Sequence, residues 1–243
     1  MLESSLLGKK ELTKSERSFT IMVNDRLLLY LTRGEFMKTT KEDILLTSLH
    51  LFAESGFDAV STGMIAEQLG ITKGALYRHY KNKQEIFDSI VQRMFEKDAE
   101  RAEEDSVPEE KYEKNPGKYE EVSFKDFCDY VVNQFEYWTK DEFASSFRRM
   151  ITIEQFKSPE KMKLYQDVIG RGPIDYSEDI FREMIKQGVL NKDAEKTGPR
   201  KLAVEFYAPL KLSIDLFDGG GDYNKLKKNL KEITDGFKER YSA

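Results

Sequence analysis

The chain has 243 residues, of which 39% are hydrophobic and 12% aromatic, and its formal net charge at pH 7 is -5. A chain of this length and apolar content can build one large or two modest packed domains. A single cysteine excludes an intramolecular disulfide, and two histidines supply no Cys/His cluster with zinc spacing, so we expect no metal, no cofactor and a reducing, cytoplasmic location. No apolar stretch approaches the roughly 20 residues of a membrane span.

Residues 1–36 differ from the rest of the chain because they carry no helix-capping signal and no sustained helical face. A purine-rich ribosome-binding site, if it were translated, would encode the residues that stand just before Met37, namely Arg33, Gly34 and Glu35. We therefore interpret residues 1–36 as a non-native or disordered extension, with Met37 as the native start. A genuine N-terminal arm is the alternative, since basic arms occur on DNA-binding domains.

From Thr40 onward the sequence predicts one helix after another, and the expected fold class is all-α. A first helix over residues 41–55 follows Thr40, and a second follows the cap candidates Ser61 and Thr62, with Met64 on its predicted buried side. Thr72 starts a third, short helix. Asn82, with Glu85 three residues later, opens a longer fourth helix that is expected to reach residue 99.

The second and third helices are short and joined by a tight turn, and the longer first helix braces them. This is the helix-turn-helix arrangement, whose second member enters the major groove of DNA. The stretch around that member is basic, with no acid between Thr72 and Gln84. Basic side chains suit a phosphate backbone because each neutralised phosphate releases counterions. Residues 37–99 are therefore predicted to form a DNA-binding domain.

The stretch FAESGFDAVSTGMIAEQLGITKGALYRHYKNKQEIF, residues 52–87, resembles the DNA-binding domain of the TetR family of bacterial transcriptional repressors. The shared features are a Phe-x-x-x-Gly-Phe/Tyr turn, a Thr before the second helix and a Lys-Gly-x-Leu-Tyr-x-His-Phe/Tyr-x-x-Lys signature. The resemblance implies phosphate contacts at the start of the second helix, groove-facing residues in the third and backbone contacts beyond them. The implied phosphate contacts of the second helix are Thr62 and Gly63. The implied groove-facing residues of the third helix are Thr72, Lys73, Gly74 and Ala75. The implied contacts to the DNA backbone beyond them are Tyr77, His79 and Lys83.

Residues 100–122 are acidic and contain Pro108, Pro116 and Gly117, which interrupt any long helix. This composition predicts a solvated connector. Residues 123–243 are again helical and are predicted to form a second domain for ligand binding and dimerisation.

Aromatic and methionine residues cluster on consecutive helices of this second domain. Core packing accounts for any one of them, but the group exceeds what a small bundle requires, and pockets between helices are lined in this way. The resemblance strengthens this interpretation, because TetR-like proteins bind a small inducer in their C-terminal domain. The candidate residues for an apolar or aromatic effector are Phe127, Phe135, Trp138, Phe147, Met150 and Phe181.

The last two predicted helices flank Gly219, Gly220 and Gly221 and carry strong apolar stripes. In the TetR family the terminal helices of two subunits form a four-helix bundle, so the resemblance implies a homodimer. The candidate interface residues are Leu202, Phe206, Leu210, Ile214, Leu226, Leu230 and Ile233.

Together these features favour a ligand-responsive bacterial repressor that binds double-stranded operator DNA as a homodimer. A module of the same fold that only binds proteins or oligomerises is one alternative, against which Lys73, Tyr77 and Lys83 argue. An enzyme built in the C-terminal pocket is another, but the sequence shows no nucleophile motif and no cluster of titratable groups, so no catalytic residue is predicted.

Overall fold

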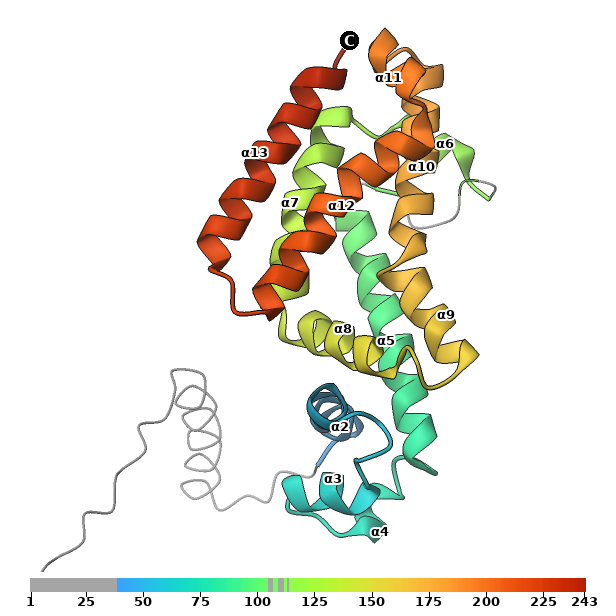
Figure 1. Ribbon diagram of the computed structural model, residues 1–243. Coiled ribbons are helices and arrows are strands. Elements are labelled where there is room, and N and C mark those ends of the chain that lie inside the picture. Colours follow the sequence, from blue (N-terminus) through green and yellow to red (C-terminus); the bar gives the residue numbers. More distant parts are fainter. Residues whose placement is uncertain (1–38, 105–106, 109–111, 113) are drawn as a thin grey trace, which may run out of the picture. The chain divides into compact units, whose positions relative to one another are not determined.

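The computed structural model describes residues 39–104, 107–108, 112 and 114–243, and the extension predicted over residues 1–36 lies outside them. Within the described residues the secondary structure is helical, apart from an isolated bridge between Leu190 and Ser242, which confirms the all-α prediction (Figure 1). The helices are α2 (Lys41–Ser55), α3 (Thr62–Gln68), α4 (Lys73–Leu76), α5 (Lys83–Glu104), α6 (Pro116–Glu120), α7 (Phe124–Lys140), α8 (Glu142–Glu154), α9 (Pro159–Val168), α10 (Arg171–Lys186), α11 (Lys192–Thr197), α12 (Pro199–Asp218) and α13 (Tyr223–Tyr241).

Helices α2, α3 and α4 form the predicted helix-turn-helix arrangement. The Ser61 hydroxyl caps α3 by accepting from the backbone N–H of Met64 at 3.2 Å, and Gly70, with φ +65°, ends it in the left-handed region. The prediction that Met64 is buried is wrong, because its side chain is 42% exposed. A helix of only seven residues turns Ile65 and Ala66 to the core and leaves the neighbouring position in solvent.

Helix α5 begins beneath the helix-turn-helix and continues into the second domain. The Asn82 side chain accepts from the Glu85 N–H at 2.8 Å, as predicted, while the Glu85 carboxylate accepts from the N–H of Lys81 at 2.6 Å. Ile86 and Ile90 are fully buried beneath the helix-turn-helix. The helix then continues to Glu104, five residues beyond the predicted end.

The segment predicted as a solvated connector is partly folded onto the second domain. Pro116 occupies the first turn of α6, where its missing N–H costs nothing, so it begins a helix instead of breaking one. Tyr119 is 2% exposed, and its ring lies 5.2 Å from that of Tyr112 and 6.1 Å from that of Tyr176.

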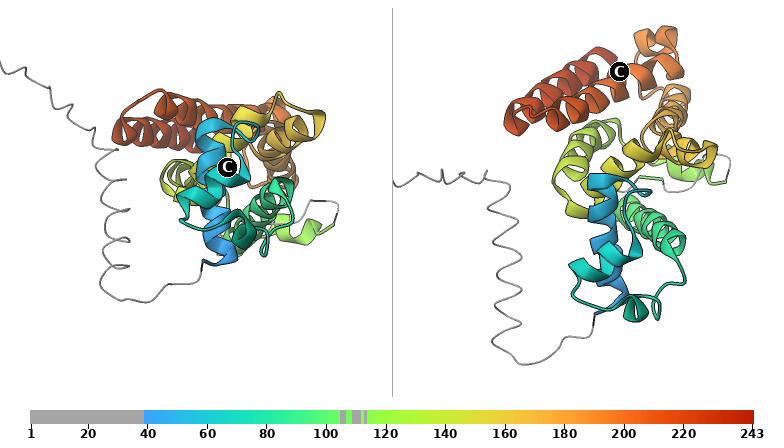
Figure 2. Two further views of the ribbon diagram at one scale, coloured as in Figure 1. Left: turned by 90° about the horizontal axis from the view of Figure 1, so that it is seen from below. Right: turned by 60° about the horizontal axis from the view of Figure 1, so that its bottom comes forward.

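The remaining helices pack into a bundle with an aromatic core. Helix α12 contacts α7, α10 and α13, and α12 and α13 lie side by side along their lengths (Figure 2). Phe127, Phe181, Phe206 and Phe237 meet at the centre, with the Phe127 and Phe206 rings stacked at 4.8 Å. None of the described helices is both long and apolar enough to span a bilayer.

Candidate DNA interface and ligand cavity

Two contacts join the start of α3 to α4 and bring the predicted DNA-binding residues together. The Thr62 hydroxyl lies 3.0 Å from the Tyr77 hydroxyl. A side chain at Gly63 would place its Cβ 2.7 Å from Cε of Lys73, so the glycine leaves room for that lysine. The two predicted phosphate contacts of α3 therefore lie against two predicted contacts of α4.

Helix α4 exposes its N-terminal turn and buries its opposite side. Thr72, Lys73 and Gly74 are exposed, and the Thr72 hydroxyl also caps the helix by accepting from the Ala75 N–H at 3.1 Å. Tyr77 is 49% exposed. Absence of a Cβ at Gly74 allows close approach of the backbone to a ligand.

The far side of α4 is anchored in the core. Leu76 is fully buried and Tyr80 is 1% exposed, with the Tyr80 hydroxyl donating to the carbonyl of Lys41 at 3.2 Å. Burial raises the pKa of Tyr80 to about 12, so this hydroxyl keeps its proton at neutral pH. Ala75 and His79 are half-buried, which leaves them at the edge of the exposed surface.

Lys83 is placed differently from the other predicted DNA contacts. Its ammonium donates to the carbonyls of Phe57 at 2.5 Å and Val60 at 2.7 Å, and it lies 4.1 Å from the centre of the Phe57 ring. The side chain is half-buried. Lys83 therefore ties α5 to the loop between α2 and α3, and a phosphate contact would require these bonds to be shared or broken.

We expect Lys83→Ala to destabilise the protein without changing the salt dependence of DNA binding. The two hydrogen bonds that it removes involve a charged donor, each worth about 1.5–3 kcal/mol, toward the lower end here because the site is half-exposed. Lys73→Ala should instead lower the log–log salt slope by about 0.9 for each phosphate that is no longer neutralised. Urea unfolding measures the loss of stability, and fluorescence anisotropy with operator DNA measures the salt slope. A salt slope lowered by Lys83→Ala would support the phosphate contact that the sequence predicted for Lys83.

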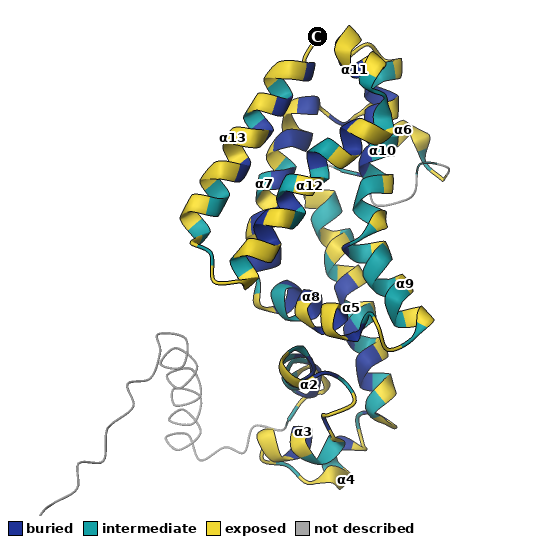
Figure 3. Cartoon of the chain, viewed as in Figure 1, coloured by how far each residue is buried: buried dark blue, intermediate teal, exposed yellow. Residues whose placement is uncertain are grey.

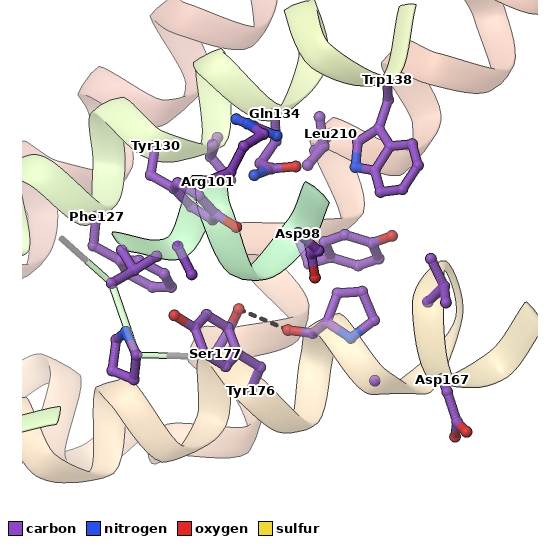
Figure 4. A pocket seen from close by; sticks show the side chains of 18 of the residues that line it. Asp98, Arg101, Phe127, Tyr130, Gln134, Trp138, Asp167, Tyr176, Ser177 and Leu210 are labelled. Carbon is purple, nitrogen blue, oxygen red and sulfur yellow. Dashed lines mark hydrogen bonds between the residues drawn. The ribbon is translucent and has the colours of Figure 1, made fainter. Parts of the chain in front are cut away.

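A cavity of about 240 Å³ lies among α5, α7, α10 and α12 (Figure 4). Of the six predicted ligand-binding residues, Phe127 and Trp138 line it. Its wall also contains Met94, Phe95, Asp98, Arg101, Ala102, Val107, Pro108, Tyr130, Val131, Gln134, Asp167, Val168, Gly172, Pro173, Tyr176, Ser177, Phe206, Tyr207 and Leu210.

The other four predicted ligand-binding residues do not line this cavity. Phe135, Phe147, Met150 and Phe181 are fully buried in side-chain packing. The Phe135 ring stacks on Tyr223 at 5.5 Å, for example, and neighbouring helices fill the space that a ligand would need. Helical periodicity identifies an inward side but not whether another side chain already occupies it.

The cavity wall is more polar than the sequence predicted. The Arg101 guanidinium stacks on the Tyr137 ring at 3.7 Å, and Asp167 is ion-paired with Lys163. The Ser177 hydroxyl donates to the carbonyl of Pro173 at 2.8 Å. Among the residues that the structure describes, no three His, Cys, Asp or Glu side chains gather as metal ligands would.

The helix-turn-helix is held to the second domain by a buried carboxylate. Glu154, at the end of α8, is 1% exposed and accepts from the Phe57 N–H at 2.8 Å. It is also ion-paired with Lys161 of α9, whose ammonium lies 4.6 Å from the Phe57 ring centre. Nothing in the sequence around Glu154 distinguishes it from surface glutamates, so sequence reasoning missed it.

Most of the predicted dimer stripe is core within the subunit. Leu202, Phe206, Leu210, Ile214 and Leu230 are at most 4% exposed, Leu226 is half-buried, and only Ile233, at 52%, lies in solvent. The strong stripe of α12 is used against α7 and α10. The opposite side exposes Val204, Ala208, Leu212 and Leu216 at four-residue spacing, and the outward faces of α12 and α13 are visible in Figure 3.

Comparison with known sequences agrees with the helix-turn-helix geometry. The model of the family described as "Bacterial regulatory proteins, tetR family" matches residues 44–90. The chain is 28% identical over 180 residues to an uncharacterised HTH-type transcriptional regulator, YerO of Bacillus subtilis, covering 66% of this chain and 61% of YerO. It is 35% identical over 57 residues to the class C tetracycline repressor of Escherichia coli, covering 24% of this chain and 26% of that one. The chain thus spans less than two thirds of these relatives.

Comparison with solved structures supports the whole fold. SmeT, the repressor of the Stenotrophomonas maltophilia multidrug efflux pump SmeDEF, aligns over 86% of this chain and 93% of its own with a TM-score of 0.59 and 21% identity. The SmeT–triclosan complex aligns over 84% and 91%, with a TM-score of 0.62 and 20% identity. The helix-turn-helix of this chain is therefore that of the TetR family of bacterial regulatory proteins, and the chain as a whole shares the fold of SmeT.

Proposed function

We propose that this protein is a homodimeric transcriptional repressor that binds operator DNA through α3 and α4 and releases it when a small effector occupies the cavity. The observation that carries the proposal is the exposed N-terminal turn of α4, with Lys73 and Tyr77 supported by Gly63 and Thr62. Side chains of these types donate to phosphates and to base edges.

Helix α5 offers a direct mechanical link between effector and DNA. Its first turns pack under the helix-turn-helix through Ile86 and Ile90, and Met94, Asp98 and Arg101 line the cavity further along. A ligand that fits better when α5 is tilted would move the attached α4 helices of a dimer out of register with successive major grooves. A coupling of about 1–3 kcal/mol would lower operator affinity roughly 5- to 150-fold.

Two names among the relatives support the repressor role and the effector. The tetracycline repressor and SmeT are named as repressors, and a SmeT structure holds triclosan, a small molecule. The aromatic wall of the cavity, including Phe127, Trp138 and Phe206, suits a ligand of that kind.

The proposal is tested by selecting bound sequences from random DNA duplexes with the full-length protein and placing the selected site in a promoter for transcription in vitro. We expect a two-fold symmetric site and a transcript level that falls as protein is added. An increase in transcript would identify an activator, and selection of no common sequence would support the alternative of a protein-binding module.

We expect Glu154→Ala to loosen the attachment of the helix-turn-helix to the second domain. The substitution leaves the Phe57 N–H and the half-buried Lys161 without their shared acceptor, a change that costs up to about 3 kcal/mol, the lower end for buried pairs. Glu154→Gln, which keeps an acceptor for Phe57, should cost less. The backbone amides of residues 52–60 should exchange hydrogen faster in Glu154→Gln than in the wild type, and faster still in Glu154→Ala. Unchanged exchange in both variants would contradict the role of Glu154 in holding the helix-turn-helix to the second domain.

A further inference from the structure

Gln134 is the exception among the buried polar residues of the described chain. The nine that are buried are Ser48, Gln134, Thr139, Arg148, Glu154, Ser177, Glu183, Ser213 and Thr234. Eight of them make side-chain hydrogen bonds to the protein. Gln134 is 7% exposed, and within the described residues its amide has no hydrogen-bond partner in the protein.

Gln134 lies in the wall of the cavity described above. Gln134 is one helical turn from both Tyr130 and Trp138 on α7, and all three residues line the same space. Figure 4 shows the three along α7, in the wall of the cavity that Arg101 and Leu210 also line. The amide therefore lies between two aromatic side chains, within reach of a molecule that stacks on either ring.

An amide in this position contributes no hydrogen bond to the folded protein alone. Native proteins pair most of their buried polar side chains, so an amide that lines a cavity without a protein partner is available to a bound molecule. A carboxamide presents one acceptor and two donors, so its best partner carries a donor and an acceptor side by side. With a volume of about 240 Å³, the cavity is below the roughly 300–1,000 Å³ of most drug-sized pockets and suits one or two fused rings.

We propose that the effector is a compact, neutral aromatic compound whose edge carries an adjacent hydrogen-bond donor and acceptor, as a lactam or amide does, and that Gln134 recognises this edge. This assignment rests on the proposed effector role of the cavity. The cavity wall contains both acidic side chains, Asp98 and Asp167, and a basic one, Arg101. Because the wall carries charges of both signs, it does not favour a ligand of either charge over a neutral one.

A first experiment needs no ligand. Gln134→Leu keeps the approximate volume and removes an amide that makes no hydrogen bond within the protein, so the unfolding temperature of the unliganded protein should not fall. Thr139→Val is the matched control: Thr139 is equally exposed, at 7%, but donates to the Phe135 carbonyl at 2.5 Å, so its replacement should lower the unfolding temperature. A fall with Gln134→Leu comparable to that of the control would show that Gln134 has a structural role and would overturn the proposal.

A second experiment uses two probes that differ in one donor, 2-quinolinone and N-methyl-2-quinolinone, with binding measured by calorimetry. We expect the parent lactam to bind the wild-type protein about 10-fold more tightly, and Gln134→Leu to abolish the preference. Equal binding of the two probes, or no binding of either at millimolar concentration, would overturn the ligand class.

Operator affinity measured with the same lactam separates this inference from the proposed function. Loss of operator binding that depends on Gln134 supports both. A Gln134-dependent preference for the lactam with unchanged operator affinity would retain the ligand class and contradict the effector role.

Discussion

Replacing Leu212 and Leu216 with glutamate is expected to convert a dimer to monomers and to weaken operator binding about 100-fold or more. Both side chains lie on the outward face of α12 and are 59% and 49% exposed in the single chain. An interface with two-fold symmetry uses the same face twice, so the double substitution would place four carboxylates in an apolar contact. A monomer presents one α4 and cannot bind the second half-site.

Sedimentation at micromolar protein measures the assembly directly. Phe156→Glu is the control, because Phe156 is 81% exposed but lies beyond the end of α8, away from α12 and α13; this variant should remain dimeric. Ile214 is unsuitable for the test because it is 2% exposed, and a charge there would disrupt the subunit itself. A Leu212→Glu/Leu216→Glu protein that sediments as the wild-type dimer would contradict the proposed face.

The double substitution Lys73→Ala/Tyr77→Ala should lower operator affinity about 1,000-fold while leaving the fold intact. It removes two proposed DNA contacts from each subunit of the proposed dimer, and at roughly 1 kcal/mol or more for each side chain the total is about 4–5 kcal/mol. Both side chains are exposed, so little core packing is removed with them.

Two further variants separate the causes. Tyr77→Phe removes the hydroxyl that lies 3.0 Å from Thr62 while keeping the ring, and it should show a part of the Tyr77→Ala effect. Arg149→Ala removes an exposed positive charge on α8 and should leave operator affinity unchanged. Unaltered affinity in the Lys73→Ala/Tyr77→Ala protein would mean that α4 is not the recognition helix.

The sequence predicted the helix-turn-helix in detail because its signals are local. A cap at Ser61 or Thr72 and a left-handed glycine at Gly70 act within a few residues, so they can be recognised without knowing the rest of the fold.

Non-local features were not predictable in this way. Phe135 and Ile214 lie on apolar stripes, but whether a stripe contacts its own subunit, a ligand or a partner depends on which helices pack against it. The true exposed stripe, including Leu212, contains fewer large residues and was hidden by the stronger one. Lys83 has the reach and charge for a phosphate, and only the fold brings the carbonyls of Phe57 and Val60 to its ammonium.

The central claim is that this protein reads a DNA sequence, and the affinity ratio between its selected site and a scrambled duplex tests it most directly. Fluorescence anisotropy at physiological salt gives both dissociation constants from one protein preparation. We expect the selected site to bind about 1,000-fold or more tightly than the scrambled duplex, with affinity falling linearly in log–log form as salt is raised. Equal affinity for the two duplexes, or no binding to either, would contradict sequence-specific recognition.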